Sequence, residues 1–480
     1  MAEEGGEIVD SLGIRRNMSK TKMLWQSATW ACYGYWSIGV VVDHWMGCHP
    51  KSWTCDTVAY LLPNWGELAL RSIGNVQDMC GFLVLGAMQD AGDDPKQGAQ
   101  IGLRELVVWM LHILTYVFIP LVDSLTPWQP GYPNVQTSQI HRWYLWMYVL
   151  ARLLLAAFTR LQVPAALQVT IVALCSFAAP KRGLLDVCNT TDKASFVHGL
   201  GFMLFPSYCQ DEHHSVGASA VRELTSGNVC TCAVTGPMEL AYMAYYIAAF
   251  HLAPYVKQLP RCTVALVVFG GLASGLTVLM DRFPVLRSEP ALAPALLSIL
   301  LPAWAAHRSA EARGWEAPAP LLLGTFALSQ LTVSQYYYPM DFLERGKLSA
   351  DAPLQLLLCT VQPLMVIAAA LKVVAAAPDS QRMGWVSSIV KLAGSSALGT
   401  YLFHYYFTPT AVLLVNNGAF AVSQASWLGP LRGLVTFAVV LLVPFAWVLL
   451  AGPAFQLLLT SPVRFLARFM EKKPPAPAMS

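Results

Sequence analysis

The chain has 480 residues, of which 55% are hydrophobic and only 12% are charged. Soluble domains carry about 25% charged residues, so this composition excludes a surface made mainly for water. The formal net charge of +3, without a basic stripe interleaved with aromatic residues, excludes nucleic acid as the expected partner. The composition therefore indicates an integral membrane protein whose main partner is the lipid bilayer.

The first segment, 1–23, is polar, and we expect it to lie in the cytoplasm. It contains no apolar stretch followed by a small-residue cleavage site, so we predict no cleavable signal peptide. The first apolar span, from about Leu24, would act as an uncleaved signal anchor. We therefore expect a multi-pass protein of an endomembrane (ER or Golgi) or of the plasma membrane.

Apolar windows long enough to cross a bilayer, about 17–25 residues, occur along most of the remaining chain. They lie at 24–46, 73–89, 104–122, 140–160, 163–180, 237–256, 262–280, 290–306, 319–338, 352–376, 392–415 and 430–458. The windows 73–89 and 290–306 are borderline. The prediction is an all-α, polytopic transmembrane bundle of about 10–12 spans. We treat 24–458 as one transmembrane domain and 459–480 as a cytoplasmic tail.

Basic residues flank both ends of this domain, including Arg15 and Lys22 before it and Arg464 and Lys473 after it. Because basic loops stay on the cytoplasmic side, both termini are expected there, which requires an even number of spans. The basic pair Lys181-Arg182 conflicts with this topology, because it would begin a luminal loop.

Six cysteines are concentrated in two predicted luminal loops. They are Cys48 and Cys55 in loop 47–72, and Cys188, Cys209, Cys230 and Cys232 in the Cys-rich loop 181–236. This clustering predicts disulfides in an oxidising compartment, but the spacing leaves their connectivity open. The longer loop also holds the sequon Asn189-Thr190-Thr191, so we predict a glycoprotein modified at Asn189.

The same loop contains His213 and His214 between Cys209 and Cys230, which raises the question of a zinc site. The spacing matches no standard zinc-ligand pattern. Disulfides within a solvated polar loop are the favoured interpretation, and no metal is predicted.

His44 follows Asp43 at the end of the first span. A carboxylate near an imidazole can raise its basicity, as a general base requires. Adjacent residues on a helix do not face each other, so Asp43 need not be the partner. Two interpretations stay open: a general base, or a histidine that anchors the helix end together with Trp45.

His404 lies in the apolar aromatic stretch that begins at Tyr401. An ionisable group at bilayer depth loses its hydration and is rarely placed there without a partner or a task. His404 could be a base, a substrate ligand or a histidine satisfied within the bundle.

His141 and Arg142 begin the window 140–160, and Arg152 lies inside it. A buried arginine is costly unless it is paired, and its planar fork suits phosphate or carboxylate. Arg142 is equally compatible with an interfacial anchor. For Arg152 we favour a binding site or a structural ion pair over exposure to lipid.

Four segments, in this order, resemble the membrane acyltransferase-3 family, which includes sugar O-acetylases of bacterial surface polysaccharides and eukaryotic relatives. They are GVVVDH at 39–44, CGFLVLG at 80–86, IHRWYL at 140–145 and LGTYLFHY at 398–405. The order and spacing of these four segments agree with those of the family over about residues 24–455.

The resemblance implies an O-acyltransferase that moves an acyl group, most simply acetyl, from acyl-CoA to a hydroxyl of a carbohydrate or lipid. The expected roles are His44 as general base with Asp43 orienting it, His141, Arg142 and Arg152 at the donor or the oxyanion, and His404 with Tyr401 at the acceptor. Acetyl-CoA or another acyl-CoA would be a substrate, and no tightly bound cofactor is implied.

One position departs from the family pattern, which has Arg or Lys eleven residues before the first-helix histidine. That position is Tyr33 here, so the cation is missing or comes from elsewhere, for example from Arg152. This departure leaves open a non-catalytic structural or assembly subunit of the same fold. A small-solute or proton-coupled transporter is the other alternative, because buried His, Asp and Arg residues mark proton and ion paths as readily as active sites.

Overall fold

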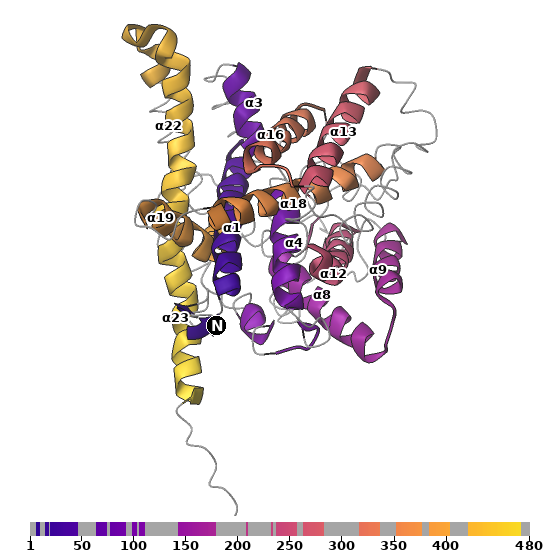
Figure 1. Ribbon diagram of the computed structural model, residues 1–480. Helices are drawn as coiled ribbons and strands as arrows, with labels where there is room; N and C mark the ends of the chain where they lie inside the picture. The colour runs from indigo at the N-terminus through magenta and orange to yellow at the C-terminus, as the bar shows by residue number, and fades with distance from the viewer. Residues whose placement is uncertain are drawn as a thin grey trace, which may run out of the picture.

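In the computed structural model the chain folds into packed α-helices, which confirms the predicted all-α class (Figure 1). The structure describes residues 6–9, 15–18, 20–46, 64–73, 77–92, 98–102, 105–110, 143–178, 208–209, 232–233, 237–256, 263–282, 316–336, 352–376, 384–403 and 421–471. Statements about structure below refer to these residues.

The helices fall largely on the apolar windows of the sequence. The first are α1 (Lys20–Met46), α3 (Asn64–Ile73), α4 (Gln77–Ala91), α8 (Trp143–Arg160) and α9 (Ala165–Ala178). The next are α12 (Pro237–Val256), α13 (Thr263–Arg282), α16 (Ala319–Tyr336) and α18 (Ala352–Ala376). The last are α19 (Gly384–Ser395), α20 (Ala397–Phe403), α22 (Arg432–Ala446) and α23 (Gly452–Glu471), with a 3₁₀ turn at Ser426–Leu431 and a π turn at Trp447–Ala451.

Helix α1 organises the centre of the structure, because it packs against α4, α18 and α19 (Figure 1). Its Trp36 is only 2% exposed and lies on α4. A Cβ on Gly81 would overlap the Trp36 ring, so this helix crossing requires glycine at position 81. Glycine inside a helix costs about 1 kcal/mol relative to alanine, and here the packing of the indole offsets that cost.

The window 392–415, predicted as one span, is divided differently. Helix α19 already begins at Gly384, and α20 starts anew after a turn at Ser396. The Ser396 hydroxyl donates to the carbonyls of Leu392 at 2.7 Å and Ala393 at 3.2 Å. A serine that bonds the preceding turn competes with the backbone and often bends a helix, although Ser274 makes the same bond inside the continuous helix α13.

One stretch, Ser426–Ser461, has 36 residues and is the described helical stretch long and apolar enough to cross a membrane. It contains α22 and forms a column along one side of the molecule (Figure 1). Only 19% of it is buried, whereas the core helix of a soluble protein would be mostly buried. This single helix indicates membrane association, and the number of spans stays a prediction.

Two short antiparallel strand pairs accompany the helices, and the sequence did not predict them. Strand β1 (Gly6–Val9) pairs with β2 (Arg15–Met18) in the polar amino-terminal segment. In the Cys-rich loop, β3 (Tyr208–Cys209) pairs with β4 (Cys232–Ala233), and the register sets Cys209 opposite Cys232.

This register leads to a prediction about the disulfides. Directly opposed residues of an antiparallel pair have Cα atoms about 4.5–5.5 Å apart, within the range that a disulfide spans. We therefore expect Cys209 to be bonded to Cys232. Non-reducing proteolysis and mass spectrometry should find the two peptides linked, with the free and buried Cys32 as an internal control. Linkage of Cys209 to a different cysteine, or a free thiol there, would contradict the pairing.

Candidate functional site

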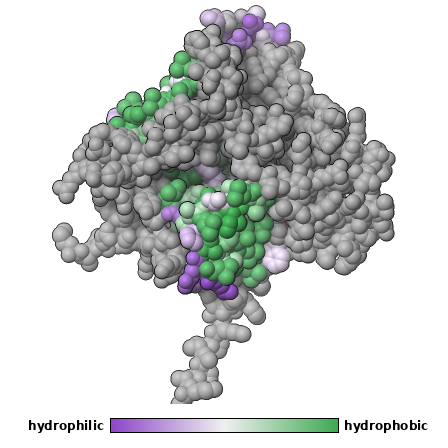
Figure 2. All heavy atoms as spheres, turned by 90° about the vertical axis from the view of Figure 1, so that its right-hand side faces the viewer, coloured by the Kyte–Doolittle hydropathy of each residue, from purple (hydrophilic) through white to green (hydrophobic). Residues whose placement is uncertain are grey.

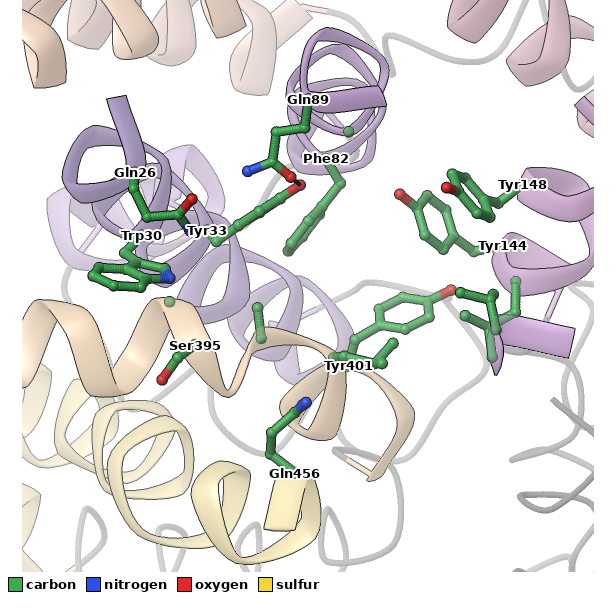
Figure 3. A pocket seen from close by; sticks show the side chains of 16 residues that line it. Gln26, Trp30, Tyr33, Phe82, Gln89, Tyr144, Tyr148, Ser395, Tyr401 and Gln456 are labelled. Carbon is green, nitrogen blue, oxygen red and sulfur yellow. Dashed lines mark hydrogen bonds between the residues drawn. The ribbon is translucent and has the colours of Figure 1, made fainter. Parts of the chain in front are cut away.

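A cavity of about 180 Å³ lies between α1, α4, α8, α19, α20 and α23 (Figure 3). Its lining side chains are mainly aromatic or amide-bearing, with small residues where helices meet. They are Gln26, Trp30, Tyr33, Phe82, Gly86, Gln89, Val108, Tyr144, Leu145, Tyr148, Gly394, Ser395, Ala397, Leu398, Tyr401 and Gln456. None of these residues carries a formal charge, so the lining offers neutral hydrogen-bonding groups between apolar walls.

One wall is formed by α1 and α4. The Tyr33 ring stacks on Phe82 with ring centroids 5.5 Å apart. The Tyr33 hydroxyl donates to Gln89 Oε1 at 3.2 Å, a bond visible in Figure 3. The position at which the sequence departs from the family pattern is therefore part of the cavity wall.

The opposite wall brings together α8 and α20. The rings of Tyr144 and Tyr401 meet edge to face with centroids 5.5 Å apart. Tyr401 is 7% exposed and is a predicted acceptor-site residue, and the structure places it in the cavity. The hydroxyls of Tyr144 and Tyr148 are directed across the cavity toward Phe82 (Figure 3).

Small residues let the surrounding helices approach closely. Gly399 of α20 donates its backbone N–H to Gln456 Oε1 of α23 at 2.8 Å, which orients one lining amide. Gly394 of α19 lies so close to α1 that a Cβ there would overlap the Trp30 backbone. Gly86 differs, because a Cβ there would lie 3.9 Å from the Tyr33 hydroxyl and 4.0 Å from that of Tyr144, at ordinary contact distance.

A carboxylate lies directly behind the α8 wall. Asp90, in the last turn of α4, is 8% exposed. Its Oδ2 accepts hydrogen bonds from the hydroxyls of Tyr148 at 2.9 Å and Tyr246 at 2.6 Å. A buried carboxylate needs such donors, because burial without hydrogen bonds is very costly. Tyr148 therefore connects the neutral cavity to a buried acid.

Arg152 lies one helical turn beyond Tyr148, outside the cavity lining. Its Nε donates to Glu105 Oε1 at 2.8 Å, and its Nη2 donates to the Gln100 carbonyl at 3.1 Å. The side chains of Arg152 and Glu105 are 4% and 7% exposed. Of the two interpretations that the sequence left open, the structure shows the ion pair. Donor binding by Arg152 stays a prediction.

Asp43 and His44 occupy the last turn of α1, and their side chains lie outside the described part of the chain. Among the α1 residues whose side chains are described, the last that lines the cavity is Tyr33. Eleven residues at 1.5 Å each separate Tyr33 from His44 by about 16 Å along the helix axis. The backbone of His44 therefore lies about three helical turns from the level of Tyr33, and its role as a base stays a prediction.

The remaining predicted residues are placed only in part. Cys209 and Cys232 lie on β3 and β4. Positions outside the described residues are His141, Arg142, His404, Cys48, Cys55, Cys188, Cys230 and Asn189.

Sequence reasoning missed Asp90, Tyr148 and Glu105. The predicted window 73–89 stopped one residue before Asp90, which made it appear to be a loop residue, whereas α4 continues to Ala91. An acidic residue at the end of an apolar window was the available signal. Its tyrosine partners lie 58 and 156 residues away, and no local pattern indicates them.

A scan against models of protein families, a search of curated proteins and a search of solved structures each found no match to this chain.

Proposed function

We propose that this chain is an integral-membrane O-acyltransferase, which moves an acyl group, most simply acetyl, from acyl-CoA to a hydroxyl of a carbohydrate or lipid. One observation carries the proposal. Segments 80–86, 140–145 and 398–405, three of the four that resemble the membrane acyltransferase-3 family, each contribute side chains to one cavity. Tyr33, at the family's cation position, lines it as well. Segments far apart in a chain have no reason to converge unless packing or function brings them together.

The proposal includes a helical bundle that crosses the membrane several times. Apolar side chains gather on the face of the molecule that carries α9, bordered below by hydrophilic residues (Figure 2). Leu161 is 74% exposed and Leu174 is 61% exposed. On the opposite column, Leu442 and Leu450 are 65% and 74% exposed. Contiguous apolar surface of this kind marks a protein or membrane contact, and lipid contact fits the low charge of the chain.

The cavity suits the chemistry of acyl transfer. Its volume of about 180 Å³ equals the liquid volume of roughly six water molecules, enough for a short acyl group with part of an acceptor. A thioester is already activated, so the protein has to hold the hydroxyl close to the carbonyl carbon and remove its proton. Tyrosine and amide groups between aromatic walls can orient both reactants without a charged ligand in the lining.

A proton-coupled carrier is the second candidate, because Asp90 and the Arg152–Glu105 pair are buried beside the cavity. Ionisable groups buried among apolar helices mark proton paths as readily as active sites. A carrier would show solute flux in vesicles with no covalent product. A purely structural subunit would show neither and would copurify with a stable partner.

The decisive experiment uses purified, detergent-solubilised protein, radiolabelled acetyl-CoA and a mixed glycan and lipid acceptor extract. The wild type should form labelled product. Gly86→Ala should lower kcat/KM about tenfold or more, because one added methyl in a binding pocket commonly has an effect of this size. Its thermal midpoint should not change, since the new Cβ meets both tyrosine hydroxyls at ordinary contact distance.

Gly275→Ala on α13 is the matched control, because a Cβ there has nothing within 4 Å and the position is outside the cavity lining. Gly275→Ala should retain the wild-type kcat/KM and the wild-type thermal midpoint. His44→Ala, assayed in parallel, tests the base predicted from the sequence. Absence of labelled product from folded wild-type protein would refute the transferase function. Full activity of Gly86→Ala would show that acyl transfer does not take place in this cavity.

A further inference from the structure

The proposed transferase needs a group that accepts the proton of the attacking hydroxyl. The base predicted from the sequence, His44, lies about 16 Å along α1 from the level of Tyr33. Among the residues that the structure describes, the lining contains no carboxylate or histidine. Within the described part of the chain, a proton acceptor for chemistry in the cavity would act from behind the lining, through one of its polar side chains.

Asp90 is the buried acid in this position. Two tyrosines from two different helices, Tyr148 of α8 and Tyr246 of α12, donate to its Oδ2 at 2.9 and 2.6 Å. Their rings meet edge to face with centroids 5.7 Å apart, so each hydroxyl is held by packing as well as by its hydrogen bond. The carboxylate is thus fixed between two donors.

The two tyrosines differ in one respect that matters for function. Tyr148 lines the cavity, whereas Tyr246 does not. A phenol has one proton, and that of Tyr148 is donated to Asp90. What Tyr148 can offer a ligand in the cavity is its oxygen as an acceptor, which selects a group that donates a hydrogen bond, such as a hydroxyl.

We propose that Tyr148 is a catalytic residue that receives the proton of the acceptor hydroxyl, and that Asp90 is the positioning residue that takes up the proton of Tyr148. This inference rests on the proposed transferase function. As the hydroxyl proton moves to Tyr148 Oη, the phenol proton moves to Asp90 Oδ2. The acceptor oxygen attacks the acyl carbonyl carbon, and the carbon–sulfur bond breaks. The thiolate then takes a proton back along the same path, which leaves an ester, a free thiol and the original tyrosine and carboxylate.

Tyr148→Phe and Tyr246→Phe form a matched pair for testing this relay. Each variant removes one hydroxyl donor from the same oxygen of Asp90, so their losses of stability should be similar. Only Tyr148→Phe removes an acceptor from the cavity. With radiolabelled acetyl-CoA and the glycan and lipid extract, Tyr148→Phe should lower kcat about 100-fold or more, the usual contribution of general-base catalysis. The KM for acetyl-CoA should stay within about threefold. Tyr246→Phe loosens Asp90 but leaves the acceptor in the cavity, so it should lower kcat by less than about tenfold.

Asp90→Asn supplies a second variant in case Tyr148→Phe does not fold. The asparagine amide oxygen can still accept from both tyrosines, but it cannot take a proton, so kcat should fall as in Tyr148→Phe. Retained kcat in Tyr148→Phe, or an equal loss in Tyr246→Phe, would overturn the relay while leaving the transferase function intact. Loss of activity in His44→Ala with unchanged Tyr148→Phe would assign the base to His44. Folded wild-type protein without transfer would overturn the function and the relay together.

Discussion

Replacing Arg152 by methionine should lower the free energy of unfolding by about 3–5 kcal/mol, the usual cost of removing one partner from a buried ion pair. The substitution would leave the Glu105 carboxylate, which is 6% exposed, without its cation. Among the described residues, the Gly102 backbone N–H, 2.8 Å from Glu105 Oε2, would remain as a donor. Denaturant unfolding of the detergent-solubilised protein, followed by tryptophan fluorescence, would measure the loss.

The exposed ion pair Lys372–Glu316, 2.7 Å long against 2.8 Å for Arg152–Glu105, is the matched control. Glu316 is 54% exposed, so Lys372→Met should change stability by less than about 1 kcal/mol. The double variant Arg152→Met with Glu105→Leu should regain much of the stability, because no unpaired buried charge remains. A single-variant loss no larger than that of Lys372→Met would show that the buried pair is not stabilising.

The double variant also separates two roles of Arg152. A variant that is stable but has lost acetyl-CoA transfer would support the donor-binding role expected from the sequence. A variant that is stable and active would leave Arg152 as a structural residue alone.

Gly394→Ala should destabilise the protein by about 3 kcal/mol, at the upper end of what overpacking usually costs. A Cβ on Gly394 would overlap the carbonyl and Cα of Trp30, which are backbone atoms of α1 and cannot rotate away. The only relief is separation of α1 from α19, the helices whose packing forms one end of the cavity. Thermal unfolding of the variant and the wild type in detergent, without added ligand, would show the lowered midpoint.

Gly271→Ala is the comparison for this steric argument, because nothing lies within 4 Å of a Cβ at position 271 of α13. Alanine is the better helix former by about 1 kcal/mol, so this variant should be neutral or slightly stabilised. Equal midpoints for Gly394→Ala and Gly271→Ala would mean that the close approach of α1 and α19 does not limit stability.

The positions of the helices could be predicted from the sequence to a large extent. The predicted windows 237–256 and 352–376 coincide with α12 and α18. A run of apolar residues is a local property, and its length and ends can be read directly from the chain. The division at Ser396 was missed because the window 392–415 was read from its apolar content, which does not mark where one helix ends and the next begins.

The candidate site was predictable only in pieces. Tyr401 was named from its place in an aromatic stretch, and the structure places it in the cavity. Nothing in the sequence indicated that its ring would meet Tyr144, or that Gln456 would be oriented by the backbone of α20. These contacts join residues that are distant in the chain, and they exist only after the helices pack.

Composition and apolar periodicity alone therefore determined the helical class, the approximate extent of most helices and the choice of ionisable residues worth examining. The tertiary structure decided which of those residues meet. It paired Arg152 with Glu105, set Asp90 between Tyr148 and Tyr246, and left His44 about three turns of α1 beyond Tyr33. The physical reason is that apolar burial is encoded residue by residue, whereas the partner of a buried polar group depends on how the helices pack together.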